Sequence, residues 1–123
     1  MFHRLACACA ALSAVTVMAQ SASGLNEVKD KVTKGQARLV DVREEDEWKE
    51  GHLKDATLVP LSKITKGLDA GTLKDLKAKP VYVHCRAGIR AQKAAALLKA
   101  AGVDATALKA SYDELETVFG KGK

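Results

Sequence analysis

Cysteine is scarce in this chain, and its placement is uneven. Of the three cysteines, Cys7 and Cys9 stand within the first ten residues, and Cys85 is the only one that follows them. If the N-terminal stretch is removed, the remaining thiol has no internal partner for a disulfide. Only His52 and His84 remain with it, which is too few for a zinc-binding Cys/His cluster. The sequence therefore excludes a disulfide scaffold and predicts no metal and no organic cofactor.

Aromatic residues are also few, at 4%, and the basic residues form no run. The 20 Lys and Arg residues are scattered among 15 Asp and Glu residues, giving a formal charge of +5. That charge becomes +4 without residues 1–19, because Arg4 is the one charged residue there. Nucleic-acid-binding domains concentrate positive charge in a patch or stripe. We therefore expect no nucleic-acid partner, and only a general attraction for anions.

The chain also lacks an apolar run long enough to span a membrane. The uncharged run from Leu5 to Ala19 is shorter than the roughly 18 to 20 apolar residues that a spanning helix needs. It follows a positive start at Arg4 and ends in residues small enough for signal peptidase. We expect residues 1–19 to be a secretory signal peptide, cleaved after Ala19 or alternatively after Ala22 or Ser23. The mature protein would be periplasmic or secreted and free of the membrane, with an uncleaved anchor as the alternative.

The rest of the chain, residues 24–120, is expected to form one domain in which strands and helices alternate. The expected strands are 38–43, 56–59, 81–83 and 105–108, and the expected helices are 25–32, 44–50, 61–64, 72–76, 91–101 and 112–119. Ser111 and Glu114 have the spacing of a capping box for the last helix, and residues 120–123 are expected to fray. Short links between these elements predict a three-layer α/β domain with a mainly parallel central sheet flanked by helices.

The most informative stretch is 81–90, Val-Tyr-Val-His-Cys-Arg-Ala-Gly-Ile-Arg, in which a strand pattern stops at Cys85. A helix pattern begins shortly afterwards, so Cys85 is expected at the carboxyl end of a strand, where ligands of open α/β sheets bind. Unpaired N–H groups of the loop and the helix dipole would favour the nucleophilic thiolate. Arg86 and Arg90 add positive charge, and Gly88 permits close backbone approach. The alternative, that Cys85 is an inert buried residue, does not explain these cationic neighbours.

The ordered segments resemble a single-domain rhodanese, a thiosulfate or persulfide sulfurtransferase. The matching segments are Leu39-Val40-Asp41-Val42-Arg43-Glu44, Trp48 with Gly51-His52-Leu53, Ala56 with Val59-Pro60-Leu61, and the whole of 81–90. The resemblance implies that Cys85 accepts a sulfane sulfur as a persulfide and passes it to cyanide or a thiol. A sulfur-accepting protein is a further candidate partner. One departure is Lys109-Ala110-Ser111-Tyr112, which stands where the family often has two glycines and a tryptophan.

The resemblance also implies roles for individual residues. The loop residues Arg86, Ala87, Gly88, Ile89 and Arg90 would bind the substrate, their N–H groups holding the persulfide while the two arginines orient an anionic donor. The resemblance likewise implies that Asp41 and Arg43 form a supporting ion pair beside the site. Trp48 and His52 are expected to pack rather than react. His84 should point to the opposite sheet face from Cys85, so it is not expected to be a general base.

Two other functions share part of this pattern. Cysteine phosphatases also place His-Cys before a glycine-containing loop and an arginine, but with five residues between cysteine and arginine, whereas four separate Cys85 from Arg90. The shorter loop suits a sulfur better than a phosphate. A non-enzymatic sulfur carrier or sensor would use the same fold and deliver sulfur only to a dedicated protein. Activity with small donors would distinguish an enzyme from such a carrier.

Overall fold

A four-stranded parallel sheet forms the centre of the molecule. The structure, a computed structural model, describes residues 22–123, so the expected signal peptide lies outside the described residues. The strands are β1 (Arg38–Asp41), β2 (Ala56–Leu58), β3 (Val81–His84) and β4 (Ala105–Ala107), in the order β2-β1-β3-β4. All three neighbouring pairs are parallel. The predicted α/β fold with a parallel sheet and flanking helices is confirmed.

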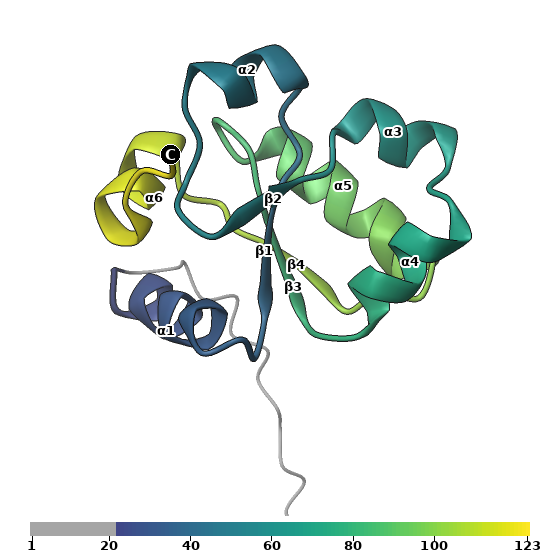
Figure 1. The fold of residues 1–123 in the computed structure, drawn as a ribbon, viewed down its shortest axis with the longest axis horizontal. Coiled ribbons are helices and arrows are strands. Elements are labelled where there is room, and N and C mark those ends of the chain that lie inside the picture. Colours follow the sequence, from purple (N-terminus) through teal and green to yellow (C-terminus); the bar gives the residue numbers. More distant parts are fainter. Residues whose placement is uncertain (1–21) are drawn as a thin grey trace, which may run out of the picture.

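Helices cover both faces of the sheet and one of its ends (Figure 1). On one face lie α1 (Ala22–Thr33) and α6 (Tyr112–Phe119), and on the other lie α3 (Leu61–Lys66), α4 (Ala70–Lys77) and α5 (Ile89–Ala100). The short helix α2 (Glu45–Glu50) lies over the carboxyl ends of the strands (Figure 1). The domain therefore has the predicted three layers, with α2 as a cover over the end where the site was expected.

Alternation along the two central strands divides their side chains between two cores. Leu39 and Tyr82 pack with α1 and α6, whereas Val40, Val81 and Val83 pack with α3, α4 and α5. Successive strand residues point to opposite faces, which explains this division. In the register of β1 and β3, Asp41 is opposite His84. The residues that end these two strands are thus held side by side by the sheet itself.

The starts of helices α5 and α6 are both fixed by identifiable N-cap residues. The predicted capping box of α6 is confirmed, since the Ser111 side chain accepts from the N–H of Glu114 and the Glu114 side chain accepts from the N–H of Ser111. Helix α5 begins at Ile89, earlier than the sequence predicted, because Gly88 with φ of 97° is its N-cap.

No helix within residues 22–123 combines the length and the apolar character needed to cross a membrane.

The expectation that residues 120–123 fray is wrong. The N–H of Lys54 donates to the carbonyl of Gly120 at 2.9 Å, and the N–H of Gly122 donates to the carbonyl of His52 at 2.7 Å. Between them, Lys121 forms an antiparallel bridge with Leu53. A glycine-rich terminal composition does not reveal these partners, because they are backbone groups of a distant loop. The tail is held against the loop between α2 and β2.

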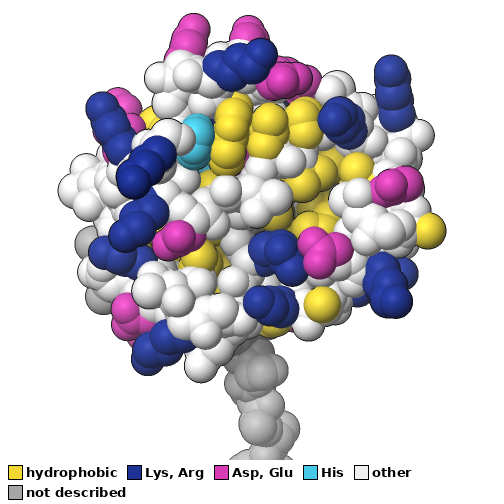
Figure 2. Space-filling model, in the orientation of Figure 1, with side chains coloured by type: hydrophobic (Ala, Val, Ile, Leu, Met, Phe, Trp, Pro, Cys, Tyr) yellow, Lys and Arg dark blue, Asp and Glu magenta, His cyan; other side chains and the backbone are white. Residues whose placement is uncertain are grey.

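Positively and negatively charged side chains are mixed on the face of the molecule seen in Figure 2. Lys and Arg side chains surround this face with Asp and Glu between them, and hydrophobic side chains gather in its upper middle part. No broad surface of one sign is visible from this side (Figure 2). The arrangement is the one expected from lysines scattered among acids along the chain.

Candidate active site

The sulfur of Cys85 lies inside a loop of backbone N–H groups. It accepts hydrogen bonds from the N–H of Gly88 at 3.0 Å and from the N–H of Ala91 at 3.3 Å. Both donors belong to the start of α5, where N–H groups lack partners within the helix. Cys85 itself is 1% exposed and packs in the core cluster beside α5. The loop therefore directs partial positive charge at the sulfur, as expected for a site that holds a thiolate.

Gly88 is required at the turn of this loop. Its φ of 97° lies in the left-handed region, which L-residues with a side chain rarely adopt. A Cβ atom at this position would also lie 3.0 Å from the carbonyl oxygen of Lys109. Only glycine therefore allows the chain to turn here and present its own N–H group to the Cys85 sulfur.

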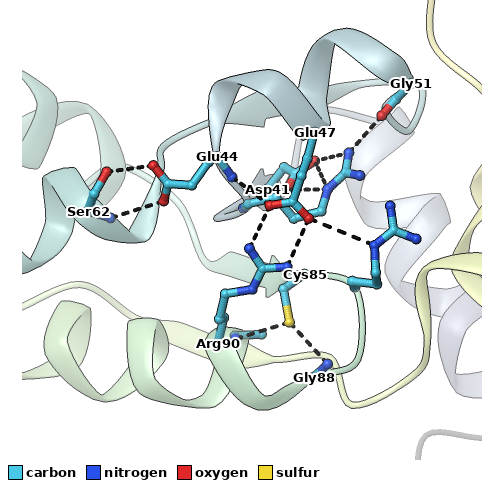
Figure 3. Close-up of polar contacts among 11 residues, drawn as sticks. Asp41, Glu44, Glu47, Gly51, Ser62, Cys85, Gly88 and Arg90 are labelled. Atoms are coloured by element: carbon cyan, nitrogen blue, oxygen red, sulfur yellow. Dashed lines mark hydrogen bonds and ion pairs between the residues drawn. The ribbon is translucent and has the colours of Figure 1, made fainter.

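Both arginines of the loop contact one carboxylate, that of Glu47 on α2. Arg90 binds it through two nitrogens, with Nη1 to Oε1 at 2.7 Å and Nη2 to Oε2 at 3.0 Å. The Nε of Arg86 lies 3.8 Å from Oε2 of the same group. Figure 3 shows Glu47 pointing from α2 towards the loop, with Arg90 reaching it beside Cys85. The positive charge expected around the sulfur is thus partly neutralised by a side chain from another element.

Glu47 is fixed by the local structure of α2 as well as by the arginines. As the third helical residue it accepts the backbone N–H of Glu44 at 3.1 Å and completes a capping box. The hydrogen bonds from Arg90 lower the pKa of Glu47 to about 2, and its capping bond with Glu44 acts in the same direction. The same contact raises the pKa of Arg90. Glu47 remains a carboxylate at any pH near neutrality.

Sequence reasoning missed Glu47, because the contact joins residues 43 positions apart. The available signal was an acidic residue in the first turn of a helix that directly follows the carboxyl end of a strand. The parallel sheet places the ends of β1 and β3 side by side, so a residue soon after β1 can reach the loop after β3. Glu47 is the clearest addition that the structure makes to the predicted site.

Asp41 and Arg43 form a buried ion pair at the carboxyl end of β1. The Arg43 Nε donates to both Asp41 oxygens at 3.0 Å, and its Nη2 donates to Oδ2 at 2.8 Å. The same Nη2 donates to the carbonyl of Gly51 at 2.7 Å, so the pair also holds the C-terminal end of α2. Burial lowers the pKa of Arg43, but the hydrogen bonds to Asp41 and the charges of Asp41, Tyr112 and Glu47 together outweigh it, so the pKa is raised overall. Geometrically the pair supports the cover over the site and does not touch the sulfur.

His84 lies on the other face of the sheet from Cys85. Its Nε2 is 3.9 Å from Oδ2 of Asp41, and its ring centroid is 6.3 Å from that of Tyr112 on α6. Burial lowers the pKa of His84 to about 4, so the ring is neutral near pH 7. Cys85 instead belongs to the core cluster beside α5. This placement agrees with the expectation that His84 is not the general base of the site.

A cleft of about 440 Å³ opens beside the loop, on the side of α6 and the C-terminal tail. Its lining includes Glu47, Arg86 and Tyr112, and also His52, whose ring stacks on that of Trp48 at 3.7 Å between centroids. The stacking fits the packing roles expected for these two rings. Among residues 22–123, no three His, Cys, Asp or Glu side chains are grouped so that they would hold a metal ion.

Residues 86–90 form one continuous loop after Cys85, as expected, but their side chains and backbone groups point in different directions. Gly88 and the helix start face the Cys85 sulfur, whereas Arg86 and Arg90 face Glu47. Ile89 is 77% exposed and points away from the core, and Ala87 is also exposed. The sulfur thus contacts backbone N–H groups, and the charged side chains form a second group above it.

Solved structures with similar folds include bacterial and human proteins. The protein hp1203 of Helicobacter pylori is 37% identical, and the match covers 68% of this chain and 74% of that chain with a TM-score of 0.57. A human single-domain sulfurtransferase is 23% identical and shares the fold, with a TM-score of 0.62 over 72% of this chain and 88% of that one.

Two curated proteins are similar over part of their length. The uncharacterized protein YqhL of Bacillus subtilis is 34% identical over 67 residues, and the tRNA uridine(34) hydroxylase of Hamiltonella defensa is 35% identical over 75 residues. These matches cover 54% and 59% of this chain, but 49% and 21% of the two relatives. The chain thus spans half or less of the curated relatives it matches.

The family comparison agrees with the fold and with the loop around Cys85. The model of the rhodanese-like domain matches residues 24–117, which include the whole sheet, the Cys85 loop and most of α6. This chain belongs to the rhodanese-like domain family.

Proposed function

We propose that the protein is a sulfurtransferase that moves a sulfane sulfur from a thiosulfate or persulfide donor to a thiol or cyanide acceptor. The observation that supports this most directly is the contact of the Cys85 sulfur with the N–H groups of Gly88 and Ala91. A sulfur held by backbone donors at a helix start is suited to carry negative charge. A persulfide ends in a sulfur that also carries negative charge, so the same kind of environment serves both states.

The chemistry balances with no external oxidant or reductant. The Cys85 thiolate attacks the outer sulfur of the donor, a Cys85 S–S bond forms, and the donor S–S bond breaks with its electron pair on the leaving group. Thiosulfate leaves as sulfite, and a thiol persulfide leaves as a thiolate. The acceptor then attacks the outer sulfur of the Cys85 persulfide, which restores the thiolate and releases thiocyanate or a new persulfide.

The chain supplies position and charge for these steps. The loop N–H groups hold the sulfur, and the Arg86 side chain, 55% exposed, is accessible to an incoming anion. Asp41 and Arg43 act indirectly, since they hold the end of α2 from which Glu47 reaches the loop. We assign Cys85 as the nucleophile, residues 86–90 as the donor-binding loop, and Asp41 with Arg43 as the supporting pair.

Intact mass spectrometry of the reduced protein before and after thiosulfate, and separately after a thiol persulfide, tests the proposal. The expected result is a gain of one sulfur on the wild type that cyanide removes as thiocyanate. Cys85→Ser should fold and gain no sulfur. A sulfur gain in Cys85→Ser, or none in the wild type with either donor, would refute sulfur transfer at Cys85. Hydrolysis of an aryl phosphate would instead support the phosphatase alternative.

We also propose that the protein is exported, because residues 1–19 have the charge and length pattern of a signal peptide. Mass analysis of the protein recovered from the periplasm or medium of its expression host should show a chain beginning at or soon after Gln20. An intact Met1 in a cytoplasmic protein would contradict export.

A further inference from the structure

The carboxylate of Glu47 occupies the positions that an anionic donor would use. Arg90 gives both terminal nitrogens to Glu47 at 2.7 and 3.0 Å, and Arg86 lies 3.8 Å from the same carboxylate. A two-oxygen group on an arginine fork is the arrangement by which proteins bind small oxyanions. Glu47 therefore satisfies internally the groups that a sulfonate-like end of a donor would seek.

The charge around the sulfur changes accordingly. Arg86 and Arg90 contribute two positive charges, and Glu47 removes one of them, because the Arg90 contact keeps it ionised. Asp41 and Arg43 form a neutral pair and add no net charge. The surroundings of Cys85 thus carry a net charge near +1 rather than the +2 expected from the loop sequence. A dianion gains less from this environment than from two free arginines.

We propose that Glu47 determines the charge class of the sulfur donor: by occupying Arg90 and approaching Arg86, it disfavours dianionic thiosulfate and leaves the persulfide of a thiol as the preferred donor. This inference rests on the proposed sulfur transfer at Cys85. A thiol persulfide brings one negative charge to the reacting end, and that charge is met by the loop N–H groups. Thiosulfate brings a second charge on oxygens that must compete with Glu47 for the arginines.

Glu47→Gln is the informative variant, because it removes the charge while keeping a side-chain oxygen for the capping box. Its control is Asp46→Asn, an exposed residue of the same helix turn with the same change in net charge. The donors are thiosulfate and the persulfide of 2-mercaptoethanol, a neutral thiol, each assayed for kcat/KM with cyanide as acceptor.

Glu47→Gln should raise kcat/KM for thiosulfate by about tenfold to a hundredfold, the range given by removing one nearby charge at surface-like dielectric. The persulfide value should rise by only about threefold to tenfold, the square root of that factor, because the persulfide carries half the charge of thiosulfate. Added salt should shrink the thiosulfate difference, since exposed charges are screened. Asp46→Asn should match the wild type with both donors.

Two outcomes would overturn the proposal. If Glu47→Gln lowers kcat/KM for both donors equally, Glu47 only holds the loop in place. If it lowers the thiosulfate value alone, Glu47 positions the arginines for the dianion instead of competing with it. Failure of the wild type to transfer sulfur from either donor would be a different result, because it would refute the proposed function itself.

Discussion

The backbone N–H of Tyr112 donates a hydrogen bond of 2.8 Å to the carbonyl oxygen of Arg86. This bond joins the tip of the Cys85 loop to the first residue of α6, and the Arg86 guanidinium lies 5.7 Å from the Tyr112 ring centroid. Tyr112 stands in the segment where the sequence departs from the glycine pair and tryptophan common in the family. The departure therefore leaves the loop anchored, with a tyrosine ring beside its first arginine.

Gly88→Ala should abolish sulfur transfer. The new Cβ would lie 3.0 Å from a backbone carbonyl, and the left-handed φ is strained for alanine, so the N–H that contacts Cys85 must move. Gly67→Ala is the control, since φ there is 106° but nothing lies within 4 Å of the added atom. Each variant should lose about 1 to 2 kcal/mol of stability from backbone strain, but only Gly88→Ala should lose persulfide formation measured by mass. Normal persulfide formation in Gly88→Ala would show that the turn geometry is dispensable.

Arg43→Met should destabilise the fold by about 3 to 5 kcal/mol, because it leaves the Asp41 carboxylate buried without its partner. Arg38→Met, at the other end of β1, removes a partly exposed pair with Asp75 and should cost at most about 1 kcal/mol. Urea unfolding of the two variants and the wild type measures both effects. Equal losses would mean that burial of the Asp41 pair has no special importance.

Stability should fall as pH is lowered from about 6.5 to about 4, in part through His84. Burial lowers the pKa of His84 to about 4 in the folded state from 6.5, so the unfolded chain binds a proton that the folded chain does not. The free energy of unfolding should drop by roughly 2 to 4 kcal/mol over this window, from the linkage of about 1.4 kcal/mol per pKa unit. Above pH 6.5 the ring is neutral in both states and contributes no slope.

The wild type and His84→Gln should be unfolded by urea at several pH values to isolate this contribution. The difference between their stabilities should shrink or reverse between pH 6.5 and 4.5. A constant difference across the window would contradict the lowered pKa of His84.

Arg90→Ala should lower kcat/KM for thiosulfate by about tenfold or more, because it removes a positive charge and leaves Glu47 as an unpaired carboxylate beside the loop. Adding Glu47→Gln to it should recover most of the loss, so the two changes would be strongly non-additive. Steady-state kinetics of the four proteins complete the cycle. Unchanged thiosulfate kinetics in Arg90→Ala would remove Arg90 from donor binding.

Much of the fold was predictable because local patterns and tertiary contacts agree. The strand before Cys85, the helix after it and the Ser111 capping box all depend on residues close in sequence. Glu47 was not predictable in this way, since its role depends on the register of β1 with β3 and on a turn of α2. The tail was misjudged for the same reason, because its partners are backbone carbonyl and N–H groups of residues 52 and 54.

Strand β3 lies between β1 and β4, and this position affects how fast its backbone amides exchange with solvent. Each strand neighbour protects the amides of Val81–His84, so those protons should exchange with solvent only when the whole sheet opens. Edge strand β2 and the short helix α2 lack such protection on both sides and should exchange through smaller openings. Strand β3, which ends next to Cys85, would then be among the last parts of the molecule to open, together with β1, while helix α2 with Glu47 would open and close many times before them.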